Sequence, residues 1–398
     1  MKAVIYGAGS IGRGFIGALF SEIGYEVVFV DVNDSVIDRI NTEKTYPQII
    51  MNEKKDIHWI KNIRAVDGKD PHAVAFEITD ADILATSVGA SILPKITPVI
   101  AQGLIKRWEK DSGAVIDLLI CENLMDADIL LRQYLLDALP SEYHTLMDQN
   151  LGLVETSIGR MVPPADPDSV SEHEHPLAVR AEPYDFLPVD KSAFKGKIPN
   201  YQKIIPFEPF HYYLERKLYI HNMAHLTTAL LGQREGISYI HEAALNPGIQ
   251  RIVQGAMTES ALMLTRRYSV DYADLQAHMD DLLYRFQNPY LKDTAARVAR
   301  EPLRKLQPSD RLVGAARNCE NSGISPVYLS FAIALCLSFM KDEDPEEILE
   351  KTCKIRKTEQ LFEHILYFYD KVTNNQLSLN DFVFELTKYQ AELRGMIV

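Results

Sequence analysis

The chain has 398 residues, which is more than one average domain and predicts two or three. Its formal net charge of −13 makes it a poor candidate for a nucleic-acid binder, and its longest apolar run, residues 326–340, is too short for a membrane span and suits a buried helix. The four cysteines form no CxxC pair, so a zinc or redox site of that kind is not expected. Their scatter, and an N-terminus without a signal-peptide pattern, predict a cytoplasmic protein.

Short strand-like runs alternate with helix-like runs in the first 140 residues. Strands are predicted at 3–6, 27–30, 83–87 and 115–121, and helices at 11–23, 34–43, 92–108 and 127–139. This alternation predicts an α/β fold with a parallel sheet that helices cover on both faces. Residues 151–206 are rich in proline and are expected to end the sheet, and helical periodicity dominates after them. We therefore predict a Rossmann-type dinucleotide-binding domain over residues 1–195 and a mostly α-helical substrate domain over residues 196–398.

The first predicted strand leads into the glycine-rich segment YGAGSIGRGF. Gly7, Gly9 and Gly12 form a G-x-G-x-x-G motif directly after a strand and at the start of a helix. Such glycines allow a tight turn and a close approach of the backbone to a pyrophosphate, which the helix N-terminus attracts. The next strand ends at Asp31, where a carboxylate binds ribose hydroxyls and repels a 2′-phosphate, so NAD is favoured over NADP. A turn without a ligand, and a flavin or nucleotide-sugar site, are the weaker alternatives.

The predicted strand at 83–87 ends at the same edge of the sheet. Its last residues reach the carboxyl ends of the strands, where open α/β sheets bind ligands. They could line the nicotinamide ribose or simply end a strand. The predicted cofactor-binding residues are therefore Gly7, Ala8, Gly9, Ser10, Ile11, Gly12, Asp31, Ser87, Val88 and Gly89.

A second pattern lies in the helical half, in the segment ERKLYIHNMAHLTTALLG at 215–232. On an α-helix, Lys217, Asn222 and His225 share one side. A desolvated lysine can take the proton of an alcohol, and asparagine amides can hold the developing oxyanion without a metal. Asn123 follows a buried strand, so it is expected at the carboxyl edge of the sheet, where it would face the same ligand-binding crevice. The alternatives are an amphipathic helix with a salt-bridged lysine and, for Asn123, a helix cap or turn.

These and further motifs resemble the polyol-specific long-chain dehydrogenase family over nearly the whole chain. They are YGAGSIGRGFIG, VDVN, CEN at 121–123, GRMVPP at 159–164, ERKL…N..H, RFQNPYLKD at 285–293 and PLRKL…DRL at 302–312. The resemblance implies that Lys217 is the general base, that Asn222 and Asn123 form the oxyanion hole, and that His225 binds and orients the substrate. It also implies NAD as cofactor, no metal, and interconversion of mannitol 1-phosphate and fructose 6-phosphate by hydride transfer.

A basic segment indicates that the substrate carries a phosphate. Residues 285–317 hold eight lysines and arginines and three acids, a balance of +5 (8 − 3) in an acidic chain. On a single helix, Arg297, Arg300 and Arg304 would share one face and cradle a dianion. These three and Lys305 are the predicted phosphate ligands. The alternative is a solvated basic face that pairs with the acidic C-terminal helices.

Other functions compete with this interpretation. Within the family they are a dehydrogenase for an unphosphorylated polyol and a hexuronate reductase. Outside it, a non-catalytic NAD-binding sensor would have no reason to keep Lys217, Asn222 and Asn123, and a hydroxyacid or opine dehydrogenase would lack the Lys…Asn…His spacing. We expect a small sugar phosphate as the partner, and a monomer or homodimer.

Overall fold

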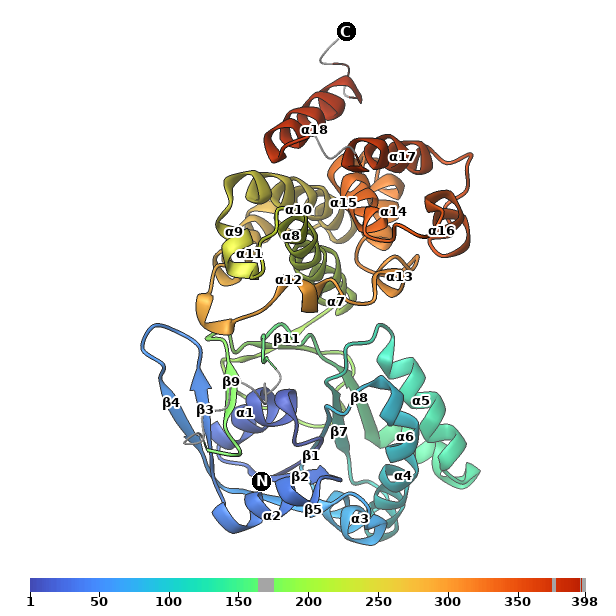
Figure 1. Ribbon diagram of the computed structural model, residues 1–398. Helices are drawn as coiled ribbons and strands as arrows, with labels where there is room; N and C mark the ends of the chain where they lie inside the picture. The colour runs from blue at the N-terminus through green and yellow to red at the C-terminus, as the bar shows by residue number, and fades with distance from the viewer. Residues whose placement is uncertain (164–174, 374–376, 394, 396–398) are drawn as a thin grey trace. The chain divides into compact units, whose positions relative to one another are not determined.

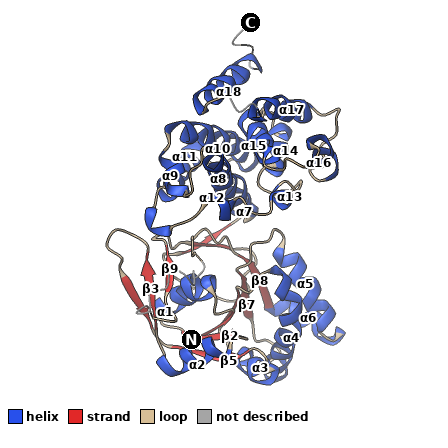
Figure 2. Ribbon diagram, in the orientation of Figure 1, coloured by secondary structure: helices blue, strands red, loops and turns tan. Residues whose placement is uncertain are grey.

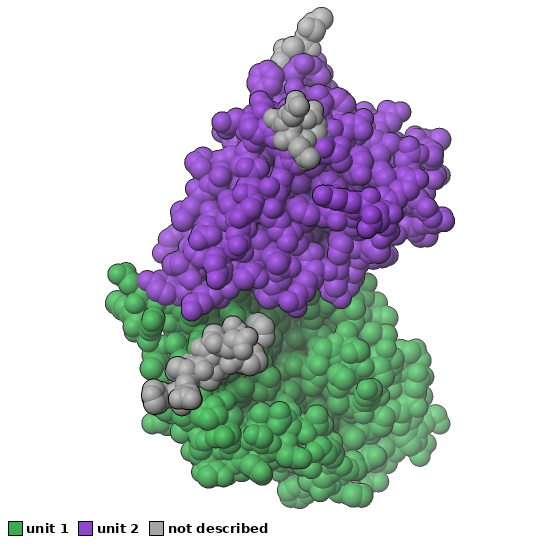
Figure 3. All heavy atoms as spheres, in the orientation of Figure 1, with its two compact units in different colours: residues 1–214 green, residues 215–398 purple. Residues whose placement is uncertain are grey.

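The computed structural model describes residues 1–163, 175–373, 377–393 and 395 (Figure 1). It divides into two compact units, residues 1–214 and 215–398, which Figure 3 colours separately. The segment after the predicted domain boundary at residue 195 contains β11 (Ile204–Phe207), which pairs in parallel with β10 (Leu187–Asp190). Residues 196–214 therefore lie with the sheet-containing unit.

Unit 1 is built around a six-stranded sheet in which every neighbouring pair of strands is parallel. In spatial order the strands are β5 (Ile63–Asp67), β2 (Glu26–Asp31), β1 (Lys2–Tyr6), β6 (Ile83–Thr86), β7 (Ile116–Ile120) and β8 (Leu151–Glu155). The order reverses between β1 and β6, and open sheets bind ligands beside the carboxyl ends of the strands at such a point. The predicted α/β class with a parallel sheet is confirmed.

Helices cover both faces of this sheet. One face carries η1 (Gly12–Gly17), α1 (Ala18–Glu22) and α2 (Asp34–Glu43). The other carries α3 (Pro71–Thr79), α4 (Leu93–Lys110), α5 (Ala127–Ala138) and α6 (His144–Asn150), with the short helices η2 (Ala90–Ile92) and η3 (Ser141–Tyr143) preceding α4 and α6. Along β1, Ala3 and Ile5 enter the first core and Val4 and Tyr6 the second. This alternation of side chains gives the sheet two apolar faces.

A second, smaller sheet packs against the first helix, and the sequence patterns did not predict it. β3 (Tyr46–Ile50) pairs antiparallel with β4 (Ile57–Ile60) and parallel with β9 (Val179–Ala181). Tyr46 Oη donates to Arg13 O at 2.6 Å, and Gln48 Nε2 donates to Gly14 O at 2.7 Å. Both carbonyls belong to the π-helical segment η1, where side-chain donors can enter the wider turn. The small sheet thus fixes the helix that follows the glycine motif.

The described residues of unit 2 contain helices and no β-strand (Figure 2). The helices begin with α7, which crosses the division between the units; in chain order they are α7 (His211–Arg216), η4 (Lys217–Asn222), α8 (Met223–Arg234), α9 (Ile240–Leu245), α10 (Pro247–Tyr268), α11 (Tyr272–Phe286), η5 (Pro289–Leu291), α12 (Ala295–Val298), α13 (Pro302–Lys305), α14 (Val313–Asn321), α15 (Val327–Ser338), α16 (Pro345–Lys351), α17 (Gln360–Thr373) and α18 (Leu379–Leu393). The apolar α15 is buried on all sides and packs against α10, α14 and α17, which confirms the buried helix predicted at 326–340. No described helix combines the length and apolarity needed to cross a membrane.

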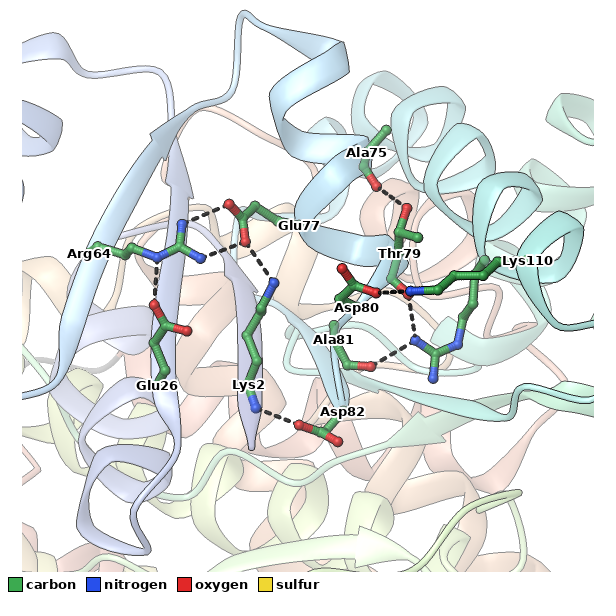
Figure 4. A network of polar contacts seen from close by, with 11 residues as sticks. Lys2, Glu26, Arg64, Ala75, Glu77, Thr79, Asp80, Ala81, Asp82 and Lys110 are labelled. Atoms are coloured by element: carbon green, nitrogen blue, oxygen red, sulfur yellow. Dashed lines mark hydrogen bonds and ion pairs between the residues drawn. The ribbon is translucent and has the colours of Figure 1, made fainter.

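Charged side chains tie together the amino ends of three strands (Figure 4). Arg64, in β5, donates to both carboxylate oxygens of Glu77 at 2.7 and 2.6 Å, and its Nε donates to Glu26 of β2 at 2.6 Å. Lys2 Nζ, in β1, donates to Glu77 at 3.0 Å. Burial opposes the ionisation of Glu77, but the hydrogen bonds from Arg64 and Lys2 outweigh it and lower its pKa. The amino edge of the sheet is therefore held by ion pairs, opposite the carboxyl edge.

We predict that Glu77→Gln lowers the free energy of unfolding by about 2 kcal/mol at pH 7, because Arg64 and Lys2 lose a shared carboxylate. Since the folded-state pKa of Glu77 is lowered, its contribution is complete above the unfolded-state value of about 4.3 and disappears as the pH falls through the folded-state value. Urea denaturation at pH 7 and pH 3 measures both effects. The control is Asp80→Asn, which removes an ion pair to Lys110 between exposed side chains and should cost less than about 1 kcal/mol. Equal losses in the two variants at pH 7 would contradict the prediction.

Candidate active site

The glycine loop after β1 is a tight turn against the neighbouring strand. Gly7 has a φ of 95°, which favours glycine, and a Cβ there would lie 2.5 Å from Ser87 O. A Cβ on Gly12 would lie 1.8 Å from Gly7 O, whereas a Cβ on Gly9 would meet no atom within 4 Å. The packing of the protein therefore requires two of the glycines, and the third leaves open space at the start of the helix. The N–H groups of a first helical turn lack intrahelical partners, so this space suits an anionic group.

Asp31, at the carboxyl end of β2, is tied to this loop. Its Oδ2 accepts from Ala8 N at 2.7 Å, and its Oδ1 accepts from Val32 N at 2.8 Å. A carboxylate has about four acceptor positions, so ribose hydroxyls can still bind. The nearby side chain of Arg13 forms hydrogen bonds with the backbone. Its Nε donates to Ala8 O at 2.6 Å, and its Nη1 donates to Leu177 O at 2.5 Å. The structure therefore brings the predicted residues of the loop and Asp31 together.

The segment after β6 joins the same edge. Ser87 Oγ donates to Gly7 O at 3.2 Å, which places this segment against the glycine loop. The next two N–H groups, of Val88 and Gly89, donate to the carboxylate of Glu122 at 3.0 and 2.8 Å. Glu122 was not predicted as a functional residue, and its only signal in the sequence is its place in the CEN motif.

Asn123 follows Glu122 in the loop between β7 and α5 and is exposed. The far end of this loop is held by Glu155, the last residue of β8, whose Oε1 accepts from Ala127 N at 3.0 Å. Burial, opposed by this hydrogen bond, raises the pKa of Glu155 to about 7. Buried carboxylates thus anchor both ends of the segment that carries Asn123.

Lys217 begins a π-helical segment, η4, that joins α7 to α8. The segment ends at Asn222, and Met223 N donates to Leu218 O, a hydrogen bond over five residues. The predicted uninterrupted α-helix over 215–232 is therefore wrong, because a wider turn separates Lys217 from Asn222, and His225 lies beyond it in α8. Turns of this kind inside α-helices occur frequently at functional sites.

The surroundings of Lys217 favour its neutral form. Burial, with a smaller contribution from the positive charge of Arg311, lowers the pKa of Lys217 to about 8. Arg311 is held in place by its own neighbour, because its Nε donates to Asp310 Oδ1 at 2.8 Å and its side chain is only 12% exposed. A lysine with a pKa near neutrality can accept a proton from an alcohol. Arg311 lies in the DRL motif, but no sequence pattern predicts that it lies near the lysine.

His225 is fixed on two sides. Its ring stacks on Phe286, with centroids 5.0 Å apart and planes 22° apart, and its Nε2 lies 3.1 Å from Asp293 Oδ2. Two nitrogens of Arg297 also donate to Asp293, each at 2.7 Å. Burial opposes the ionisation of Asp293, but His225 and Arg297 outweigh it and lower the pKa to about 2. Phe286 and Asp293 belong to the RFQNPYLKD motif, so this motif positions the histidine.

The predicted single helix with Arg297, Arg300 and Arg304 on one face is wrong. α12 ends at Val298 and α13 begins at Pro302, and Glu301 between them has a φ of 56°. Proline lacks an N–H and clashes with the preceding turn, so it begins a new helix and does not continue the first. The three arginines therefore lie on two short helices and the link between them.

Contacts within this basic segment distinguish its members. Arg304 Nε donates to Glu301 at 3.1 Å. Lys305 is buried, and its Nζ donates to Val298 O at 2.5 Å and to Arg300 O. Arg300 is exposed, and in the described part of the chain no acid pairs with its side chain. Lys305 thus holds the link between the two helices, whereas Arg300 presents its guanidinium to solvent.

Comparisons with known proteins cover both units. The sequence-family model for the mannitol dehydrogenase Rossmann domain matches residues 1–203 of this chain. The family model for the mannitol dehydrogenase C-terminal domain matches residues 210–376. The structure is similar to a D-sorbitol dehydrogenase in substrate-free form (TM-score 0.77, 14% identity, 95% of each chain). It is also similar to Pseudomonas fluorescens mannitol 2-dehydrogenase in a ternary complex with NAD and D-mannitol (TM-score 0.74, 14% identity, 98% of this chain and 94% of that chain). An octopine dehydrogenase in complex with NADH and agmatine is more distant (TM-score 0.53, 11% identity, 95% and 99%). At these identities the similarity to solved structures concerns the fold alone.

The glycine contacts predict a difference between two alanine substitutions. Gly12→Ala should lower the free energy of unfolding by about 3 kcal/mol, because its Cβ would overlap Gly7 O. Gly9→Ala should leave stability unchanged or raise it by less than about 1 kcal/mol, because the methyl group has space and restricts the unfolded chain. Urea denaturation of both variants tests this, and a Gly12→Ala protein as stable as the unsubstituted chain would refute it.

Proposed function

The chain belongs to the mannitol dehydrogenase family, and on this basis we propose that it is an NAD-dependent polyol dehydrogenase that interconverts mannitol 1-phosphate and fructose 6-phosphate. The observation that carries the proposal is the lysine that begins η4. Lys217 is enclosed, lies near a second positive charge, and has a pKa lowered to about 8. Removal of a hydroxyl proton as hydride departs requires a base of this kind.

Several contacts support NAD as the cofactor. The open space at Gly9 lies where a pyrophosphate would approach the helix N-terminus, and the carboxylate of Asp31 lies at the end of the adjacent strand. A carboxylate at this position disfavours the 2′-phosphate of NADP. Bound NAD supplies the nicotinamide ring that accepts the hydride. The residues of the chain then bind the dinucleotide, position the polyol and move the proton.

We assign the remaining catalytic roles as follows. Lys217 takes the hydroxyl proton at Nζ, and the side-chain amides of Asn222 and Asn123 donate to the oxygen as it gains charge. His225, between Phe286 and Asp293, binds and orients the substrate. An NAD-binding sensor without catalysis would need none of these groups, so turnover decides between the two functions.

The pH dependence of turnover tests the role of Lys217. Because the base must be neutral, the kcat/KM for polyol oxidation should rise with pH and level off above about pH 8. Lys217→Ala should lower kcat by about 10²- to 10⁴-fold. Arg311→Gln should move the midpoint of the pH profile upward, because removal of the neighbouring positive charge raises the pKa of the lysine.

Absorbance of reduced nicotinamide at a series of pH values measures these effects. Lys351→Ala, which changes an exposed lysine of α16 that pairs with Glu347, is the control and should behave like the unsubstituted chain. Unchanged turnover in Lys217→Ala would exclude this mechanism. No reduction of NAD with any polyol or polyol phosphate would favour the sensor.

The proposal of a phosphorylated substrate rests on the basic segment. The acids of this segment already pair with part of its charge, so we narrow the phosphate ligands to Arg300, with Arg304, which pairs with the exposed Glu301, as a secondary contact. Arg297 is paired with Asp293, and the ammonium of Lys305 is hydrogen-bonded to backbone carbonyls. These two residues are better explained as supports of the segment.

A second candidate substrate is an unphosphorylated polyol. The specific observation in its favour is the similarity in fold to a mannitol 2-dehydrogenase in complex with D-mannitol and to a D-sorbitol dehydrogenase. A hexuronate reductase of the same family is the remaining alternative. A substrate panel that contains mannitol, mannitol 1-phosphate and hexuronates separates the three.

The Arg300→Ala variant tests the phosphate site. It should raise the KM for mannitol 1-phosphate by about 10- to 100-fold, the loss of one charge-assisted hydrogen bond, and leave the kcat/KM for mannitol unchanged. Arg356→Ala, which changes an arginine that is 81% exposed and pairs with Glu359, is the matched control. Equal efficiency of the unsubstituted chain with mannitol and mannitol 1-phosphate would rule out phosphate recognition, whatever Arg300 does.

A further inference from the structure

Glu122 is a buried carboxylate at the carboxyl edge of the sheet, and the mechanism proposed above does not use it. It is 6% exposed. Its Oε1 accepts from Val88 N at 3.0 Å and its Oε2 from Gly89 N at 2.8 Å, so both oxygens bind consecutive N–H groups of one loop. A buried carboxylate is costly unless hydrogen bonds compensate it, and here the backbone provides them.

The position of these N–H groups at a helix N-terminus also stabilises the carboxylate of Glu122. Gly89 directly precedes the helix that runs through η2 and α4, from Ala90 to Lys110, so the carboxylate lies near a helix N-terminus. The partial positive charge at such an end stabilises a carboxylate. Gly89 has a φ of 91°, a conformation that favours glycine, and it turns the backbone between the strand and this helix. The carboxylate of Glu122 therefore occupies two N–H donors that an anionic ligand could otherwise bind.

Glu122 connects two loops that follow neighbouring strands. β6 and β7 are parallel neighbours, with Thr86 opposite Ile120, and Cys121 N donates to Thr86 O at 3.0 Å. One loop, after β6, lies against the glycine turn. The other, after β7, carries Asn123 as the residue that directly follows Glu122. Both loops must keep their positions if a cofactor and an oxyanion donor are to be presented together.

We infer that Glu122 is a positioning residue that locks the loop at Val88 and Gly89 to the segment that carries Asn123. This role rests on the proposed function, because Asn123 is assigned there as an oxyanion donor. Displacement of a reacting group by about 1 Å can cost about 10²-fold in rate. Glu122 should therefore influence kcat through the two loops that it holds together.

The strand that precedes Glu122, β7, offers a matched control near its amino end. Asp117, in β7, is 4% exposed and accepts from Lys195 N at 2.7 Å and from Gly196 N at 3.0 Å. It therefore repeats the arrangement of Glu122, a buried carboxylate on two consecutive N–H groups, toward the amino edge of the sheet. A variant of Asp117 loses a comparable contact without disturbing the loops at the carboxyl edge.

The test compares Glu122→Ala, the isosteric Glu122→Gln and the control Asp117→Asn with the unsubstituted chain. Three quantities are measured: kcat with the polyol substrate, the Kd for NAD, and hydrogen exchange of the backbone over residues 86–92. Both Glu122 variants should lower kcat by about 10²-fold, weaken NAD less than tenfold, and accelerate exchange in this segment. Sodium formate should restore kcat and protection in Glu122→Ala, where a carboxylate-sized space is left, and not in Glu122→Gln. Asp117→Asn should lower the Tm but keep kcat and Kd unchanged.

Accelerated exchange with unchanged kcat in the Glu122 variants would reduce Glu122 to a structural residue and overturn the inference. Unchanged exchange at 86–92 would also overturn it, because the lock would then be absent. A loss of kcat in Asp117→Asn equal to that in Glu122→Gln would assign the effect to general destabilisation. Failure of the proposed function is recognised separately, because the unsubstituted chain would then reduce no NAD. Hydrogen exchange over residues 86–92, and its slowing by formate in Glu122→Ala, would still show whether Glu122 holds the loop.

Discussion

The contact between Gly7 and Gly12 is the constraint on which the first unit depends. The helix after β1 begins so close to the strand that a single methyl group at Gly12 would overlap the carbonyl oxygen of Gly7. This approach directs the start of the helix toward the carboxyl edge, beside Asp31 and Ser87. The small sheet holds the same helix from outside through Tyr46 and Gln48. The proposed dinucleotide site thus depends on backbone packing, with few charged side chains of its own.

The second unit solves a different electrostatic problem. Its lysine is partly buried and lies near Arg311, so both desolvation and charge favour the neutral amine. Its histidine lies instead 3.1 Å from Asp293, a carboxylate that also pairs with Arg297. Two basic groups eight residues apart on one helical run therefore have contrasting surroundings. Such contrast is common where a site needs one proton acceptor and one fixed polar contact.

The sequence predicted those helices and strands that have a capping residue or a regular apolar spacing within the element itself. The helix at Asp34–Glu43 was predicted with its observed bounds, and there Asn33 caps the first turn and the buried residues Ile37 and Ile40 recur at helical spacing. β3 and β4 were missed because they are short, β3 contains Pro47, and three residues of β4 are exposed. Both π-helical segments escaped prediction, and one of them, η1, receives side-chain hydrogen bonds from Tyr46 and Gln48, more than 30 positions further along the chain. Pro302 was a local signal for the break in the basic helix, and the prediction overlooked it.

The same distinction applies to the candidate site. The meeting of the glycine loop with Asp31 could be predicted, because turn geometry and strand ends restrict those positions to few residue types. Glu122 and Arg311 could not, because their significance depends on which loop or side chain the fold places beside them. Asn123 was proposed from its motif, whereas the two buried carboxylates that anchor its loop, Glu122 and Glu155, were visible only in three dimensions.

The burial of α15 has a consequence for how the chain is made. Eleven of its twelve residues are buried, so it has no face suited to water. Its partners α10 and α14 precede it in the chain, but α17 follows it, beginning 33 positions after the start of α15 (360 − 327). During synthesis, therefore, a largely apolar helix emerges before one of the helices that cover it has been made. Exposed apolar surface of this kind binds chaperones and promotes aggregation. The nascent chain is therefore most prone to aggregation after α15 has been synthesised and before α17 covers it.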